Sequence, residues 1–235
     1  MVRGLLSSIL LILSFPKFNL FPLAWIALVP LLLSIKNSPP RYAFFLGFLS
    51  GLFAYLGLLY WIVTTITTAG ESFLVAVPCL ILLSAYLALY FGLFSIAFVY
   101  FSHLSPFTSH LFLASLWVSL EYLRTHLFTG FPWALLGYSQ WNFLPIIQIS
   151  EFTGVYGVSF LIVLVNITIF QVLTIKNVKF PPKVDQPMAE KIKNSILTGL
   201  IFLICLAYGL LTLSPITNYQ SPITVVLLQG NIDQY

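Results

Sequence analysis

The chain has 235 residues, of which 60% are hydrophobic and only 7% are charged. An ordinary soluble domain has about 25% charged residues, so this composition excludes that class and indicates a polytopic membrane protein. The formal net charge of +4 comes from ten basic residues spread through an apolar chain. We interpret them as topology signals and expect no nucleic-acid partner. Cys79 and Cys205 lie within apolar runs and are interpreted as packing residues, and no metal or organic cofactor is expected.

The predicted fold is an all-α membrane domain over residues 1–214. A helix needs about 20 apolar residues to cross a bilayer core of about 30 Å. Seven hydrophobic segments are candidates: 5–15, 21–35, 42–66, 73–101, 107–127, 152–175 and 195–213. The first two are short and are separated by the sequence PKFN, so they are expected to form a tight hairpin that does not fully cross.

Basic residues predict the orientation, because Lys and Arg near helix ends remain on the cytoplasmic side. With a cytoplasmic N-terminus and seven crossings, the inner side receives the larger group: Arg3, Lys36, Arg41, Lys176, Lys179, Lys183, Lys191 and Lys193. The outer side receives Lys17, with Arg124 close by. The C-terminal tail is therefore expected on the outer, periplasmic side.

Segment 42–66 contains a pair of glycines at the spacing typical of close helix packing. Gly47 and Gly51 form a GxxxG motif, which lets the backbone of another helix approach. Trp61 lies near the outer end of the same segment. It has two interpretations, an anchor at the membrane interface or a residue of a binding pocket.

Segment 107–127 carries two charges at membrane depth. Glu121 and Arg124 are three residues apart on one helix face, one turn after Trp117. Ionisable groups inside a membrane are costly, so both should face protein or water and find partners. One hypothesis is an ion pair that fixes the outer end of the bundle. The other is that Arg124 binds a lipid phosphate and Glu121 orients it.

The sequence TGFPWALLGYSQW, residues 129–141, is apolar but interrupted by glycine and proline. Non-helical backbone at membrane depth must be satisfied by protein or water, so we expect 128–150 to be a re-entrant or interfacial segment lining a lipid-accessible pocket. Trp133, Tyr138 and Trp141 suit the zone between acyl chains and headgroups. An ordinary aromatic belt loop is the alternative. Segment 176–194, rich in proline and lysine, is expected to be a solvated connector.

Several of these stretches occur together in one known family. They are WVSLEYLRTHLFTGFPWALLGYSQW, QISEFTGVYGVSFLIVLVN at 148–166, LSFPKFNLFPLAWIALVPLL, GFLSGLFAYLGLLYW and the tail VVLLQGNIDQY. In order and spacing the chain resembles the membrane half of bacterial apolipoprotein N-acyltransferases. The resemblance implies transfer of an acyl chain from a phospholipid to the N-terminal diacylglyceryl-cysteine of an apolipoprotein. It also implies a bacterial inner-membrane location.

The family's chemistry is expected in a nitrilase-like domain that follows the seventh helix. There a Glu, Lys, Cys triad forms a thioester on its cysteine. Residues 215–235 resemble a linker and the start of that domain, with a first strand at 223–232 that includes Gln229, Gly230 and Asn231. The sequence ends at Tyr235 before any triad residue, and neither cysteine matches the nucleophile. The resemblance therefore predicts a truncated nitrilase-like domain and a chain that is inactive alone.

Two other functions are compatible with the sequence. The chain could be a lipid-binding module that recruits a separate nitrilase-like chain, or a small transporter with Glu121 and Arg124 on its pathway. For the lipid-binding pocket, position and chemistry give one set of candidate residues: Trp61, Glu121, Arg124, Pro132, Trp133, Tyr138 and Gln140. The charged pair would hold a headgroup phosphate, Pro132 would shape the turn, and the aromatic residues would line the acyl entrance.

Overall fold

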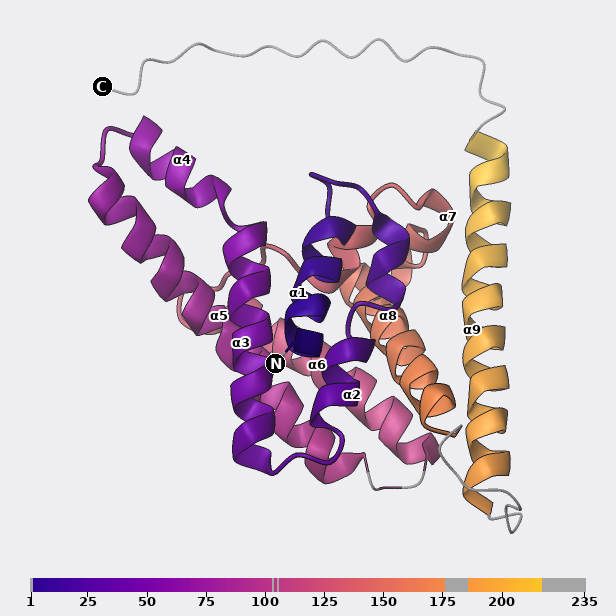
Figure 1. Cartoon of the computed structure of the whole chain (residues 1–235). Coiled ribbons are helices and arrows are strands. Elements are labelled where there is room, and N and C mark those ends of the chain that lie inside the picture. The colour runs from indigo at the N-terminus through magenta and orange to yellow at the C-terminus, as the bar shows by residue number, and fades with distance from the viewer. Residues whose placement is uncertain (1, 103, 105, 176–185, 217–235) are drawn as a thin grey trace.

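The computed structural model describes residues 2–102, 104, 106–175 and 186–216, and their regular elements are helices (Figure 1). The elements are α1 (Val2–Ser14), the 3-10 helix η1 (Phe21–Trp25), α2 (Val29–Ile35), α3 (Pro40–Leu58), α4 (Trp61–Thr68), α5 (Phe73–Phe101), α6 (Pro106–His126), the 3-10 helix η2 (Leu136–Gln140), α7 (Leu144–Ile147), α8 (Ser150–Ile175) and α9 (Gln186–Ile216). The expected strand at 223–232 lies outside the described residues. Helix α9 begins earlier than expected, so 186–194 is helix and not connector.

The expected all-α membrane protein is confirmed, with changes in how the segments divide. Four helices are long and apolar enough to cross a membrane, namely α3, α5, α8 and α9. Segment 42–66 is not one helix, because the chain breaks between α3 and α4. Segment 21–35 divides into η1 and α2, each of which has a proline in its first turn, where the missing N–H is tolerated.

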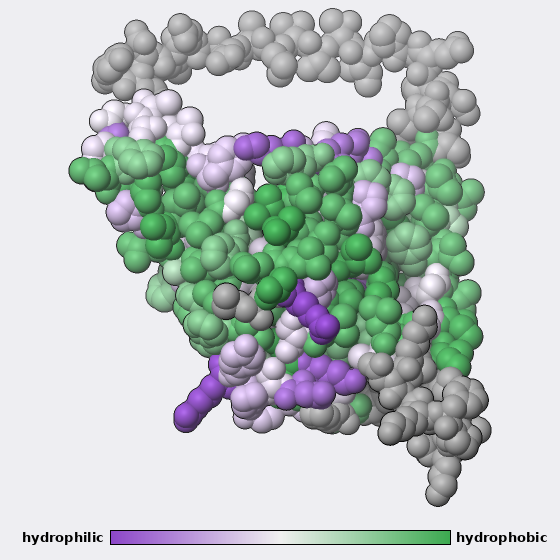
Figure 2. Space-filling view, viewed as in Figure 1, coloured by the Kyte–Doolittle hydropathy of each residue, from purple (hydrophilic) through white to green (hydrophobic). Residues whose placement is uncertain are grey.

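Hydrophobic side chains form a broad band around the middle of the molecule. Figure 2 shows this band on one face, bordered by hydrophilic residues at its upper and lower edges. Helix α8 lies largely inside the bundle, whereas α9 packs along its edge against α6, α7 and α8 and leaves most of its surface exposed. The distribution is that of a bundle solvated by lipid around its sides.

The pairing of α3 with α5 is the most extensive contact between described elements, and the predicted glycines lie within it. A Cβ atom added to Gly47 would lie 2.7 Å from the backbone oxygen of Phe91, and one added to Gly51 would lie 3.1 Å from Cα of Ala88. The two backbones therefore approach as the GxxxG motif predicts.

Replacing Gly47 by alanine is expected to lower the thermal unfolding temperature of the chain in detergent. The added methyl group would push α3 away from Phe91, and overpacking of this kind costs about 1–3 kcal/mol. Gly199→Ala is the matched control, because nothing lies within 4 Å of its added Cβ. Equal unfolding temperatures for the two variants would contradict this close helix contact.

The first hairpin is held by side chains from other helices. Neither α1, with 13 residues, nor α2, with 7, reaches the length of a bilayer span. The backbone N–H of Leu28, just before α2, donates to Oδ1 of Asn166 at 2.9 Å, and Nδ2 of Asn166 donates to the carbonyl of Ala24 at 2.9 Å. The N–H of Leu31 donates to Ser7 Oγ at 2.8 Å. These bonds satisfy peptide groups that the broken helix leaves free.

Candidate functional site

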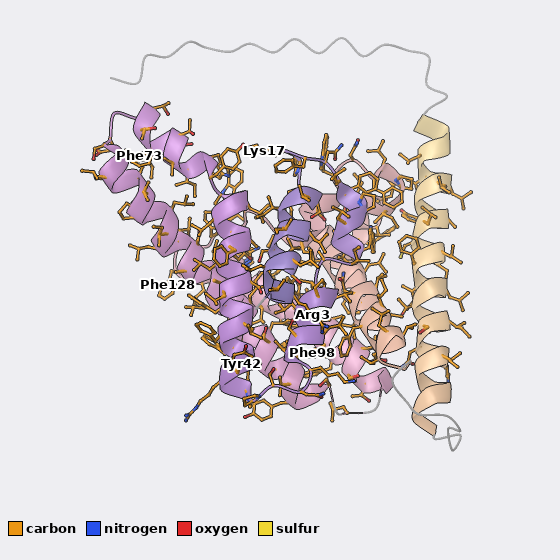
Figure 3. All side chains as sticks on the ribbon, viewed as in Figure 1. Arg3, Lys17, Tyr42, Phe73, Phe98 and Phe128 are labelled. Atoms are coloured by element: carbon orange, nitrogen blue, oxygen red, sulfur yellow. The ribbon has the colours of Figure 1, made fainter. Side chains whose placement is uncertain are left out.

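A cavity of about 310 Å³ lies where three separate stretches meet at one end of the bundle. They are the end of α1 with the turn after it, the junction of α3 and α4, and η2 with the loop before it. Its walls are formed by Ile12, Phe15, Pro16, Lys17, Phe18, Gly57, Leu58, Leu59, Tyr60, Trp61, Trp133, Ala134 and Tyr138. Figure 3 shows Lys17 at the upper end of the bundle, opposite Tyr42 at the lower end.

Aromatic rings and one cation form the wall of this cavity. The rings of Trp61 and Trp133 have centroids 5.3 Å apart and are tilted toward each other. Trp133 is 57% exposed and Tyr138 is 43% exposed, so both present ring surface to the surroundings. The Nζ atom of Lys17 lies 3.7 Å from the ring centroid of Tyr60, within the range of a cation–π contact. The cavity is therefore apolar inside, with a single positive group among its lining residues.

The loop that carries Trp133 has an unusual backbone. Phe128, Gly130 and Ala134 all have positive φ, at 57°, 73° and 55°. Helix α6 ends at this point, and a Cβ on Gly130 would collide with the carbonyl oxygen of Thr125. Glycine takes this conformation without strain and is the residue that fits beside the Thr125 carbonyl, which explains the glycine four residues after the end of α6. The chain then turns back, and the N–H of Phe131 donates to the carbonyl of Arg124 at 2.9 Å.

Arg124 supports this loop from behind. Its Nη1 donates to the carbonyl of Trp133 at 3.1 Å, and its Nη2 donates to the carbonyl of Ala134 at 2.9 Å. Its side chain is 1% exposed, and its guanidinium carbon lies 5.5 Å from the ring centroid of Tyr55. Arg124 thus binds peptide carbonyls of the pocket wall and does not reach the pocket surface.

Glu121 binds the same stretch of backbone at Leu136, two residues after Ala134. Its Oε1 accepts a hydrogen bond from the backbone N–H of Leu136 at 2.8 Å, and the side chain is 4% exposed. Glu121 and Arg124 thus both bind peptide groups of 133–136, whereas their mutual ion pair stays a prediction. Those peptide groups have no helical partner, and ionised side chains satisfy them well.

The other predicted residues lie apart from the cavity. Pro132 is exposed on the loop and is not part of the cavity lining. Gln140 is fully buried, where it accepts a hydrogen bond from Nε1 of Trp25 at 3.0 Å and donates to the carbonyl of Phe21 at 3.0 Å. Gln140 therefore joins η2 to η1. Three of the seven candidates line the cavity, namely Trp61, Trp133 and Tyr138. Glu121 and Arg124 are buried and bind the backbone of residues 133–136.

Ten of the thirteen lining residues, Lys17 and Tyr60 among them, are absent from the candidates that the sequence gives. Lys17 was interpreted only as a charge that sets orientation, and Tyr60 was not considered. The available signal was the PKFN break, which turns the chain at one end of the bundle and presents its lysine there. A second signal was the break after α3, since a helix end places its last side chains at that same edge.

The matched family model and the similar proteins all name the same family. The family described as apolipoprotein N-acyltransferase N-terminal domain matches residues 7–168. The apolipoprotein N-acyltransferase of Geobacter metallireducens is 43% identical over 99% of this chain and 43% of its own length. That of Pasteurella multocida is 30% identical over 98% of this chain and 42% of its own length. Apolipoprotein N-acyltransferase 1 of Treponema denticola is 34% identical over 69% of this chain and 29% of its own length.

These matches cover most of this chain but less than half of each relative. The match to the domain extends from α1 into α8 and includes the GFPW loop and the residues behind it. The chain therefore belongs to the apolipoprotein N-acyltransferase family and carries that family's N-terminal domain.

Proposed function

We propose that residues 1–214 form the membrane part of an apolipoprotein N-acyltransferase and that the cavity beside Trp61 and Trp133 receives an acyl chain of the phospholipid donor. The cavity volume of about 310 Å³ is within the range of small-molecule sites. Its apolar walls suit a hydrocarbon chain, and the exposed rings of Trp133 and Tyr138 suit the boundary with headgroups. This cavity is the observation that carries the proposal.

The distribution of charged residues indicates on which side of the membrane the cavity would open. Lys17 lines the cavity at the upper end of the bundle (Figure 3), and its ammonium group would attract the phosphate of a phospholipid headgroup. The excess of basic residues assigned to the other side makes that side cytoplasmic. The protein would then lie in the bacterial inner membrane with its N-terminus inside and this cavity facing the periplasm.

The transfer chemistry itself is proposed to belong to a nitrilase-like domain. The relatives are more than twice as long as the matched region, so they have room for such a domain. In this scheme the membrane part holds the phospholipid, and a cysteine thiolate of the nitrilase-like domain attacks the acyl ester, forming a thioester as the lysophospholipid leaves with a proton on its freed oxygen. The α-amino group of the diacylglyceryl-cysteine of the apolipoprotein then attacks the thioester, forming an amide and releasing the cysteine thiol. The domain could also be supplied as a separate chain.

The transporter alternative gains no support from the geometry. It required Glu121 and Arg124 on a polar pathway, but these side chains are 4% and 1% exposed and bind backbone groups of the loop. Uptake of a solute by reconstituted protein, without acyl transfer, would be needed to revive it.

A complementation experiment tests the proposed function. The chain would be expressed in cells depleted of their own N-acyltransferase, with and without a nitrilase-like continuation. Mass spectrometry would then report whether the N-terminal cysteine of a lipoprotein carries an amide-linked acyl chain. We expect acylation only with the continuation. Acylation by the 235 residues alone would show that the chemistry lies in this chain and would refute the division of roles.

Trp133→Ala is expected to raise the KM for phospholipid about tenfold in the active protein. Removing an aromatic wall loses on the order of 1.5 kcal/mol of apolar contact, which corresponds to about tenfold in affinity. Trp141→Ala is the control, because Trp141 is exposed on the same segment but does not line the cavity. Equal KM values for the two variants, measured in mixed micelles, would argue against this cavity as the acyl site.

A further inference from the structure

Glu121 and Trp117 each have a buried polar atom with no hydrogen-bond partner among the described residues. The atoms are Oε2 of the Glu121 carboxylate and Nε1 of the Trp117 indole. The two side chains are 4% and 5% exposed, so bulk solvent does not reach them. Buried polar groups of native proteins are almost always paired with protein or with ordered water. The hydrogen bonds from Arg124 and Glu121 to residues 133–136 do not involve these two atoms.

The two side chains share the same internal space. They are four residues apart on α6, which places them on one face of the helix. Both line two small cavities, of about 20 Å³ and about 10 Å³, and Tyr55 and Phe91 also line both. A cavity needs about 10–15 Å³ to accommodate one water molecule. The larger cavity therefore has room for one water but not for a larger ligand.

The chemistry of the two atoms selects the ligand. The carboxylate oxygen accepts hydrogen bonds, whereas the indole N–H can only donate one. A cation would satisfy the carboxylate but leave the indole unpaired, and an anion would be repelled by the carboxylate. Water donates and accepts at once. We propose that one internal water bridges Oε2 of Glu121 and Nε1 of Trp117.

This water would complete the support behind the cavity wall. Glu121 uses its other oxygen to hold the N–H of Leu136, three residues after Trp133. A water on Oε2 fixes the orientation of the carboxylate and thereby the position of this anchor. The proposed water depends on residues of α6 and its neighbours, so its presence can be tested independently of acyl transfer.

NMR of the full chain in detergent micelles, with the indole nitrogens labelled by ¹⁵N, tests the proposal. The chain has five tryptophans, and Trp117→Phe assigns the relevant signal. We expect a cross-peak between the Trp117 indole proton and water, with the sign of a through-space contact and not of chemical exchange. The indole of Trp25, which donates to Gln140, is the internal reference and should give no such peak. Absence of the Trp117 cross-peak would overturn the proposal.

A conservative variant tests the bridge itself. Glu121→Gln keeps a carbonyl oxygen for the N–H of Leu136 but removes the charge from the water's acceptor. We expect the Trp117 indole resonance to shift more than those of the other four tryptophans. If the Trp117 resonance does not move, the water is not shared with Glu121 and the bridge is refuted.

Discussion

Arg124→Met is expected to destabilise the protein by about 3 kcal/mol and to release the loop that carries Trp133. The substitution keeps an apolar stem but removes two charge-assisted hydrogen bonds, to the carbonyls of Trp133 and Ala134. Both carbonyls lie beside a helix end and have no other hydrogen bond described for them. Thermal unfolding in detergent would measure the loss, and tryptophan fluorescence would report increased solvent exposure of the loop.

The matched control is Arg41→Met, which removes an exposed arginine from α3. We expect it to change stability by less than about 0.5 kcal/mol. Arg124→Lys should recover only part of the loss, because a single ammonium cannot reproduce the fork that reaches two carbonyls. If Arg124→Met leaves both stability and tryptophan fluorescence unchanged, Arg124 does not support the loop. If acyl transfer alone is lost, a direct role with the phosphate returns.

Asn166→Leu is expected to destabilise the protein by about 2–4 kcal/mol. Its amide binds the N–H of Leu28, just before α2, and the carbonyl of Ala24, within η1. Leucine has a similar size but offers neither donor nor acceptor, so the N–H of Leu28 would be buried without a partner, and the carbonyl of Ala24 would keep only its longer bond from the N–H of Ala27, at 3.4 Å. Thermal unfolding and limited proteolysis near residues 20–30 would detect the loosened hairpin.

Thr174→Val provides the control on the same helix. Among the described residues, the hydroxyl of Thr174 bonds to the carbonyl of Gln171, within α8, so its loss should cost little. The comparison separates a bond that joins distant segments from one that a helix makes to itself. Equal stability of the two variants would mean that the peptide groups near Leu28 find other partners.

Features that depend on local composition could be predicted from the sequence. The low charge content and long apolar runs predict a helical membrane protein, and the Gly47 and Gly51 spacing predicts the close pairing now seen between α3 and α5. Gly130 and the proline after it predict the irregular loop. Each of these properties is set by residues within a few positions of one another, so sequence patterns report them well.

The pairing of distant segments could not be predicted in the same way. The sequence placed Glu121 and Arg124 at the spacing of an ion pair, yet each binds peptide groups of the loop that follows. Gln140 was expected in the pocket but bonds Trp25, which is 115 residues away. The helical spacing permitted either arrangement in each case. The choice depended on which unpaired backbone groups the folded chain brought within reach.

The sequence by itself determined the class of the protein, the approximate position of its apolar segments, and its family resemblance. The tertiary structure alone decided which of the candidate site residues contact one another. Trp61 and Trp133 come from segments 72 residues apart along the chain, and they form one wall only because α6 ends in a turn that returns the loop to the α3–α4 junction. The physical reason is the need to satisfy every peptide group inside an apolar bundle, which couples residues that no local pattern connects.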